Sequence, residues 1–171
     1  MKTLEAYQKI QDKISWGYQA TSPKFPGHIH EGLDYVDQPI CFYNGIIDLD
    51  LNFENGAGKM FRVKSKFKTE NQKIDFFHEY QHLKRKFFKK KENVKVGDIL
   101  GEMGSTGNST GDHVHYQEFC ISKNKRSIPA GILLLFNNKI ITKIELILKQ
   151  INSNLFYWKV PPLSFYKLGK K

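Results

Sequence analysis

Apolar positions recur at two different spacings along the chain. In the N-terminal segment they follow one another at steps of three and four residues, at Leu4, Tyr7, Ile10 and Ile14. This is the spacing of one face of an α-helix. The pattern therefore predicts a short amphipathic N-terminal helix within residues 1–17, which stops before Gly17.

Between Ser22 and about Phe119 the helical spacing gives way to short segments of β-branched and aromatic residues. These segments are residues 40–43, 46–51, 60–67, 74–83, 99–103 and 113–120. Asn-Gly pairs and a glycine-rich stretch separate them, as is typical of strands joined by tight turns. The pattern predicts a mainly β fold whose core, residues 22–120, is an antiparallel β-sandwich or barrel-like sheet.

After Pro129 the apolar spacing is helical again, with one face formed by Ile140, Ile144, Ile147, Leu148 and Ile151. Such a face is more typical of core packing than of a partner-binding helix. We expect a C-terminal helix and an aromatic tail within residues 129–171, both packed on the core. Because 171 residues fit one domain, residues 1–171 are expected to form a single domain.

An excess of positive charge adds an expectation about partners. The chain has 27 Lys and Arg against 17 Asp and Glu, a formal net charge of +10, which favours contact with polyanions such as nucleic acid, anionic lipid or bacterial cell wall. Much of the excess lies in residues 59–73 and 83–91. A solvated loop that only keeps the protein soluble is the alternative explanation.

The N-terminal residues carry scattered charges and lack the apolar stretch of a secretory signal, and no apolar run reaches the length of a membrane span. We therefore expect a soluble protein that is not exported by an N-terminal signal of its own. The two cysteines, Cys41 and Cys120, lie far apart in sequence, and two buried free thiols are favoured over a disulfide.

The six histidines fall into three close pairs, His28/His30, His78/His82 and His113/His115. Residues separated by an even number project from the same face of an extended strand. The two histidines of the last pair should therefore face the same way. By the same rule, His30 and Asp34 share a face, with the small Gly32 leaving a gap between them in which an ion could sit, and His78 shares a face with His82.

Two imidazoles and one carboxylate form a standard ligand set for a catalytic zinc ion that keeps one position for water. Zinc lowers the pKa of such a water from 15.7 to roughly 7, so hydrolysis is the expected chemistry. The strong candidates are His30, Asp34, His82, His113 and His115. These five residues are more than the three protein ligands that such a site needs. The two surplus imidazoles can transfer protons or stabilise an oxyanion. A packing role would explain any one histidine, but not three pairs.

Four motifs resemble those of the lysostaphin-type (LytM-type) zinc metallopeptidases, which cut peptide bonds in bacterial peptidoglycan. They are "HEGLDY" (residues 30–35), "YQHL" (80–83), "VKVGDILGEMGSTGNSTG" (94–111) and "HVH" (113–115). The resemblance implies one catalytic zinc ion bound by His30, Asp34 and His115. It also implies catalytic roles for His82 and His113. His28 and His78 remain the alternatives to His30 and His82, and they are expected to lie next to the ligands or at the rim of the site.

The sequence also departs from the family pattern at three places. Asp112 stands where the family usually has proline or a small uncharged residue, residues 84–93 lengthen the segment after His82, and residues 120–171 extend past the usual end. None of these departures removes a ligand, but they leave the choice of substrate open.

The resemblance predicts a zinc-dependent endopeptidase that cleaves the stem-peptide crosslinks of peptidoglycan, acts at the bacterial cell wall and works as a monomer. Without an export signal it fits a phage lysis enzyme, a virion protein or a truncated secreted hydrolase. The alternative is a non-catalytic member of the fold that binds peptidoglycan or regulates another enzyme. An iron oxygenase would leave the surplus histidines unexplained, and nucleic-acid binding rests on charge alone.

Overall fold

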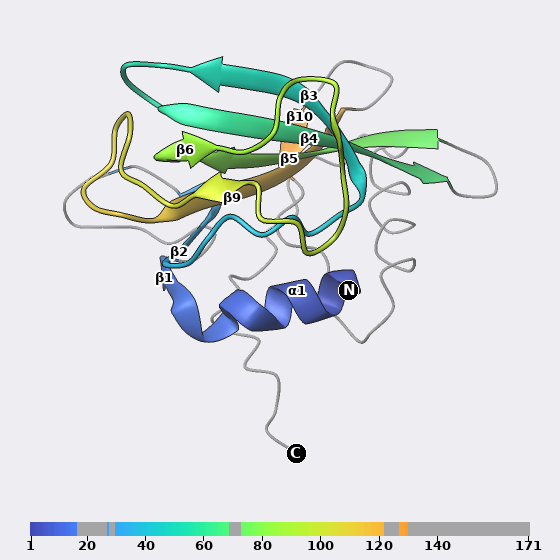
Figure 1. Ribbon diagram of the computed structural model, residues 1–171, viewed down its shortest axis with the longest axis horizontal. Coiled ribbons are helices and arrows are strands. Elements are labelled where there is room, and N and C mark those ends of the chain that lie inside the picture. Colours follow the sequence, from blue (N-terminus) through green and yellow to red (C-terminus); the bar gives the residue numbers. More distant parts are fainter. Residues whose placement is uncertain (17–26, 28–29, 69–72, 122–126, 130–171) are drawn as a thin grey trace.

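An open antiparallel sheet forms the body of the protein (Figure 1). The computed structural model describes residues 1–16, 27, 30–68, 73–121 and 127–129. The elements before the sheet's long strands are α1 (Thr3–Ile10), the 3-10 turn η1 (Gln11–Lys13), β1 (Ile14–Trp16) and β2 (Leu33–Tyr35). The remaining strands are β3 (Gly45–Asn52), β4 (Lys59–Lys68), β5 (Lys73–Gln81), β6 (Arg85–Lys86), β7 (Asn93–Val94), β8 (Gly101–Glu102), β9 (Val114–Ile121) and β10 (Ser127–Pro129).

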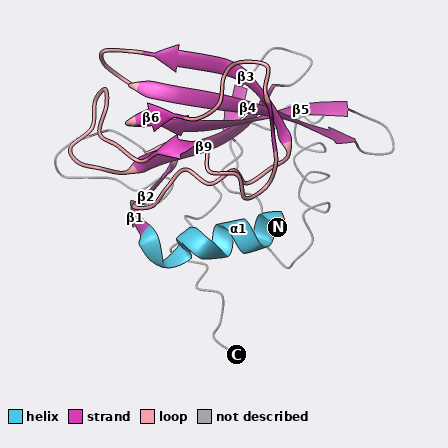
Figure 2. Ribbon diagram, in the orientation of Figure 1, coloured by secondary structure: helices cyan, strands magenta, loops and turns pink. Residues whose placement is uncertain are grey.

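The strand order places chain-distant strands side by side. The sheet runs β1-β2-β9-β5-β4-β3-β7, β10 also pairs with β9, and β6 and β8 form a separate two-stranded sheet. Strands β3, β4 and β5 are a meander of consecutive hairpins, whereas β9 lies between β5 and the N-terminal β2. The predicted mainly antiparallel β core is confirmed, and over the described residues the sheet is not closed into a barrel (Figure 2).

The core lies on one face of this sheet, which α1 crosses (Figure 1). Tyr35, Tyr80 and Tyr116 project from neighbouring strands and are fully buried. Phe42, from the segment between β2 and β3, packs among them and stacks on Tyr7 of α1 with 4.1 Å between ring centroids. Because aromatic side chains bury large apolar areas, this cluster joins the helix to the sheet.

The N-terminal helix is shorter than predicted. It ends at Ile10, and Ile14–Trp16 form a strand that pairs with β2. Ile14 continues the apolar spacing of the helix, but backbone pairing with β2 takes it into the sheet. Local spacing could not show this, because the partner strand lies about twenty residues away in sequence.

The other predicted elements have mixed outcomes. The segments that became β3, β4, β5 and β9 are confirmed. Residues 40–43 form no strand: Ile40 makes only an isolated bridge to Ile99, and the segment packs as a buried loop. The short strands β1, β2, β6, β7 and β10 lie outside the predicted segments. The expected C-terminal helix and aromatic tail lie outside the described residues.

Two smaller expectations concern the thiols and the membrane. Cys41 is a buried free thiol, and burial raises its pKa to about 12. The side chain of Cys120 lies outside the described part. Among the described residues, no helix combines the length and the apolar character that crossing a membrane requires.

Candidate metal centre

Two of the candidate ligands, Asp34 and His115, are brought together by strand pairing. Asp34 of β2 lies directly opposite His115 of β9 in the antiparallel register. Their neighbours Leu33, Tyr35 and Tyr116 point into the core, so the alternation of side chains along a strand turns the two candidate ligands to the opposite face. Asp34 Oδ1 and His115 Nδ1 are 2.9 Å apart.

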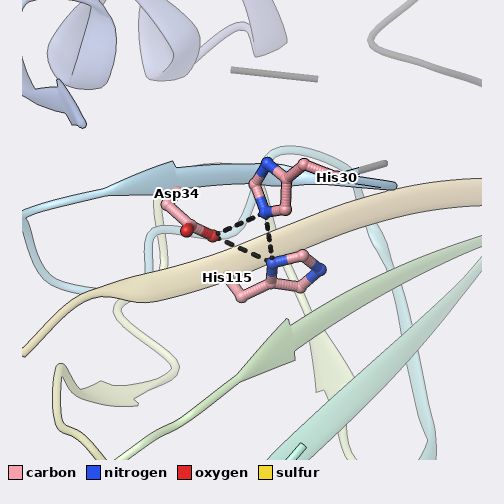
Figure 3. Close-up of side chains that lie close together, drawn as sticks. All are labelled: His30, Asp34 and His115. Carbon is pink, nitrogen blue, oxygen red and sulfur yellow. Dashed lines mark hydrogen bonds and ion pairs between the residues drawn. The ribbon is translucent and has the colours of Figure 1, made fainter. Parts of the chain in front are cut away.

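His30 completes the cluster from the segment just before β2. Its side chain is buried, and its Nε2 lies 3.1 Å from Asp34 Oδ1 and 2.9 Å from His115 Nδ1. Figure 3 shows the three side chains pointing toward one another from the two strands and the preceding segment. One donor atom from each residue lies within 4.8 Å of the other two, an arrangement that could hold a metal ion.

The chemistry of these three atoms fits a divalent cation. Asp34 Oδ1 can accept a hydrogen bond from each ring, but both ring nitrogens would then carry hydrogens and face each other across 2.9 Å. A shared cation removes this conflict, because all three lone pairs can point at it. Zinc at its usual ligand distances places tetrahedral ligands about 3.3 Å apart, close to the spacing of these atoms.

The pKa of Asp34 also favours an anionic ligand. Burial by itself raises this pKa, but hydrogen bonds and charge from His115 and His30 outweigh burial and hold the carboxyl well below its usual range. Asp34 is therefore ionised at neutral pH, which suits a ligand that must be deprotonated to bind a metal.

Gly32 makes room for His115 and not for an ion. A Cβ atom on Gly32 would lie 2.6 Å from both Cε1 and Nε2 of His115 and 2.6 Å from the backbone oxygen of Tyr116. The predicted gap between His30 and Asp34 is thus filled by the third candidate ligand, which arrives from β9. The even spacing of His30, Gly32 and Asp34 predicted an open space at Gly32, but it could not show which side chain fills that space.

Adding a methyl group at this position should displace His115. We expect Gly32→Ala to weaken zinc binding by at least about tenfold, the size of effect seen when a group that orients a metal ligand is lost. Competition with a chelating dye would measure the affinity. Gly111→Ala is the matched control, because no heavy atom lies within 4 Å of a Cβ there. Equal zinc affinity for the two variants would contradict the assignment.

His82 reaches the site because it lies beyond the end of β5. Strand β5 ends at Gln81, and His82 has a φ of 64°, a left-handed conformation in which histidine is over-represented among non-glycine residues. Its N–H donates to the Ala57 carbonyl at 2.9 Å. Its Nδ1–H donates to the Thr106 carbonyl at 2.8 Å, since a carbonyl can only accept, and Nε2 stays available.

His113 lies beside His82, with 4.9 Å between their ring centroids. It precedes β9 and bridges Gly104. Its Nδ1–H donates to the Gly111 carbonyl at 2.8 Å, and its Nε2 lies 3.7 Å from Asp34 Oδ2. The five residues predicted to form the site therefore converge, although they come from three separate stretches of the chain.

His82 is held in its neutral form. Burial lowers its pKa, and the neighbouring imidazoles of His113 and His115 act in the same direction. The Thr106 carbonyl and Asp34 oppose this shift but do not cancel it. A neutral imidazole with one unprotonated nitrogen can accept a proton near neutral pH.

His115 also contacts a polar chain that sequence reasoning did not identify. Its Nε2 lies 3.4 Å from Gln117 Oε1, and Gln117 Nε2 donates to Glu79 Oε2 at 2.7 Å. Metal-binding histidines commonly donate their second N–H to such a partner, which fixes the ring orientation. The sequence contained part of this information, because Gln117 follows His115 by two residues and lies on the same face of the strand.

His78 is not near this site. It is fully buried on the core face, where it stacks on Tyr43 with 4.1 Å between centroids and lies 3.1 Å from the Tyr116 hydroxyl through Nδ1. Burial lowers its pKa well below the usual value. The prediction that His78 and His82 share a face was wrong, because the strand ends between them. His28 lies outside the described residues.

Comparisons with known proteins place the chain in a family and show similar folds. Residues 43–128, half of the chain, match the model of peptidase family M23. The structure is similar to the catalytic domain of the antimicrobial peptidase lysostaphin from Staphylococcus simulans, with a TM-score of 0.57 and 26% identity over 71% of this chain and 92% of that one.

Two relatives are similar in sequence. The peptidoglycan DD-endopeptidase ShyC of Vibrio cholerae is 41% identical over 58% of this chain. An uncharacterized metalloprotease of Buchnera aphidicola subsp. Baizongia pistaciae is 28% identical over 68% of it. The aligned parts span 22% of the Vibrio protein and 33% of the Buchnera protein.

An antiparallel sheet that presents two histidines and a carboxylate on one face, beside two further histidines, defines a metallopeptidase-type fold and site. The chain belongs to peptidase family M23, and the resemblance to lysostaphin-type peptidases is confirmed. The matched residues include His82, His113 and His115 but begin after His30 and Asp34. The case for these last two as ligands therefore rests on the geometry.

Proposed function

We propose that this protein is a zinc-dependent endopeptidase that hydrolyses peptide crosslinks of bacterial peptidoglycan. The observation that carries the proposal is the convergence of His30, Asp34 and His115 on one point, with donor atoms 2.9–3.1 Å apart. Membership of the M23 family and the similarity to a peptidoglycan endopeptidase support the substrate class.

The residues divide into two roles. His30, Asp34 and His115 would hold one zinc ion, which supplies Lewis-acid polarisation and a water of lowered pKa. His82, neutral and with Nε2 available, accepts the proton of the attacking water. His113 is oriented by its bond to the Gly111 carbonyl, and it stabilises the oxyanion or protonates the leaving nitrogen.

The basic segment after His82 supports contact with anionic polymers of the cell envelope. Lys84, Arg85 and the run 89–91 are exposed. Arg85, although exposed, pairs with Glu102, and the half-buried Lys86 pairs with Asp50. Exposed cations, of which Lys84 follows His82 by two residues, would hold the enzyme on an anionic surface. We further propose a monomer that acts at the cell wall, as a phage lysis or virion protein or as a secreted hydrolase.

Digestion of defined peptidoglycans tests the proposal. The purified protein should contain about one zinc per chain and release crosslink-derived fragments that mass spectrometry identifies. The masses would show whether the cut bond is D-alanyl-diaminopimelyl or lies in a glycine bridge. Zinc binding without cleavage of any wall would instead support the non-catalytic, peptidoglycan-binding alternative.

The pH dependence follows from His82. Because burial and the neighbouring imidazoles lower its pKa, the neutral form needed as a base should persist below pH 6.5. A zinc ion would lower this pKa further. We expect the acid limb of the kcat/KM profile to lie below pH 6.5, measured at buffered free zinc on a soluble crosslinked peptide. An acid limb near pH 7 or above would argue against His82 as the base.

A further inference from the structure

Trp16 stacks on His30. The indole of Trp16 and the imidazole of His30 are nearly parallel, with 7° between their planes and 4.2 Å between their centroids. Trp16 belongs to β1 and lies opposite Asp34 in the pairing of β1 with β2. One residue of the N-terminal segment is therefore in contact with one candidate ligand and is the strand partner of another.

The three candidate ligands are not fixed in the same way. Asp34 and His115 lie on paired strands, so the sheet ladder sets their positions. His30 lies outside the strands, where its ring orientation depends on side-chain contacts. A flat indole against one face of the imidazole restricts rotation of the ring and keeps Nε2 aimed at Asp34 and His115. A ligand that is ordered before the metal arrives loses less conformational entropy on binding.

The N-terminal segment is itself anchored. Tyr7 and Ile10 of α1 are buried in the core, and the Tyr7 hydroxyl bonds to Glu118 of β9. In addition, the Ser15 hydroxyl donates to the Asp34 backbone oxygen at 3.3 Å. The position of Trp16 is thus determined by the packing of α1, which precedes β1, and by the contacts of β1 with β2.

We propose that Trp16 is a positioning residue of the metal centre and that residues 1–16 are part of the functional site. The inference rests on the proposed zinc site. It goes beyond that site because Trp16 precedes the residues that match the family and offers no metal ligand.

Zinc affinity of the full chain, measured by chelator competition, tests the proposal. We expect Trp16→Ala to weaken binding about tenfold and Trp16→Phe, which keeps an aromatic face, to stay within about threefold of wild type. Lys13→Ala is the matched control, because it removes the exposed ion pair with Asp37 beside the same strand pair without touching the ring. Loss of affinity in Lys13→Ala equal to that in Trp16→Ala, or wild-type affinity in Trp16→Ala, would overturn the proposal.

Fluorescence provides a second test that does not require Trp16→Ala to fold. The chain has two tryptophans, so Trp158→Phe leaves Trp16 as the sole indole. Zinc should change its emission, saturating at one ion per chain, whereas Trp16→Phe, which keeps only Trp158, should not respond. Zinc bound without any change in Trp16 emission would refute the stacking role alone. Failure of the wild type to bind zinc would refute the proposed function as well.

Discussion

Asp34→Asn should remove both zinc binding and peptidoglycan cleavage. The substitution keeps the shape of the side chain but replaces the anionic oxygen that faces both His30 Nε2 and His115 Nδ1. Because loss of a residue that merely orients a ligand costs about 10- to 100-fold in metal affinity, loss of the charged ligand itself should cost more than about 100-fold. Elemental analysis after dialysis and a cell-wall turbidity assay would measure the two effects.

Asp37→Asn is the matched control for this variant. Asp37 is the same residue type three positions away, and it pairs with Lys13 at the surface. We expect the control to keep zinc and activity at wild-type levels. Retention of stoichiometric zinc by Asp34→Asn would show that the ion is held elsewhere, and the assignment of His30, Asp34 and His115 as ligands would then fail.

The second large effect is expected when the two remaining histidines are removed separately. His113→Ala and His82→Ala should each bind zinc with near wild-type stoichiometry and lose about 10²- to 10⁴-fold in kcat, the usual contribution of a positioned acid or base. Both rings lie beside the three candidate ligands without belonging to them, and the Nδ1–H of each ring donates to a backbone carbonyl. Metal content and turnover of a soluble crosslinked peptide separate binding from catalysis.

Asp112→Asn provides a control next to His113. Asp112 is exposed, so removal of its charge should leave turnover within about threefold of wild type, as for most surface substitutions. Full activity in His113→Ala would rule out its catalytic role. Loss of zinc from His82→Ala or His113→Ala would instead identify that residue as a ligand.

The variants at Asp34 and His113 also distinguish the proposed enzyme from a non-catalytic member of the fold. In a protein that only binds peptidoglycan, Asp34→Asn would lose zinc, but neither wild type nor His113→Ala would release fragments. In the proposed endopeptidase, cleavage depends on all five side chains, and only three of them control metal content.

Much of the fold could be predicted from the sequence because the patterns involved are local. β-Branched and aromatic residues bounded by turn signals identified β3, β4 and β9 from residues 46–51, 60–67 and 113–120, and the period of two placed His113 and His115 on one side of Val114. The kinds of residue were also informative, since imidazoles and a carboxylate set the metal chemistry wherever they meet. The five candidate site residues were named on this basis and on the motif resemblance, and the structure brings them together.

Only the tertiary structure showed how these residues meet. Pairing of β2 with β9 joins Asp34 to His115 across 81 positions in sequence, and hydrogen bonds of that range leave no trace in local spacing. The end of β5 and the left-handed turn at His82 send His78 into the core and His82 to the site, because contacts with Ala57 and Thr106 fix that turn. The sequence determined which side chains could bind a metal ion and activate water. Long-range strand pairing decided which of these side chains share one face of the sheet.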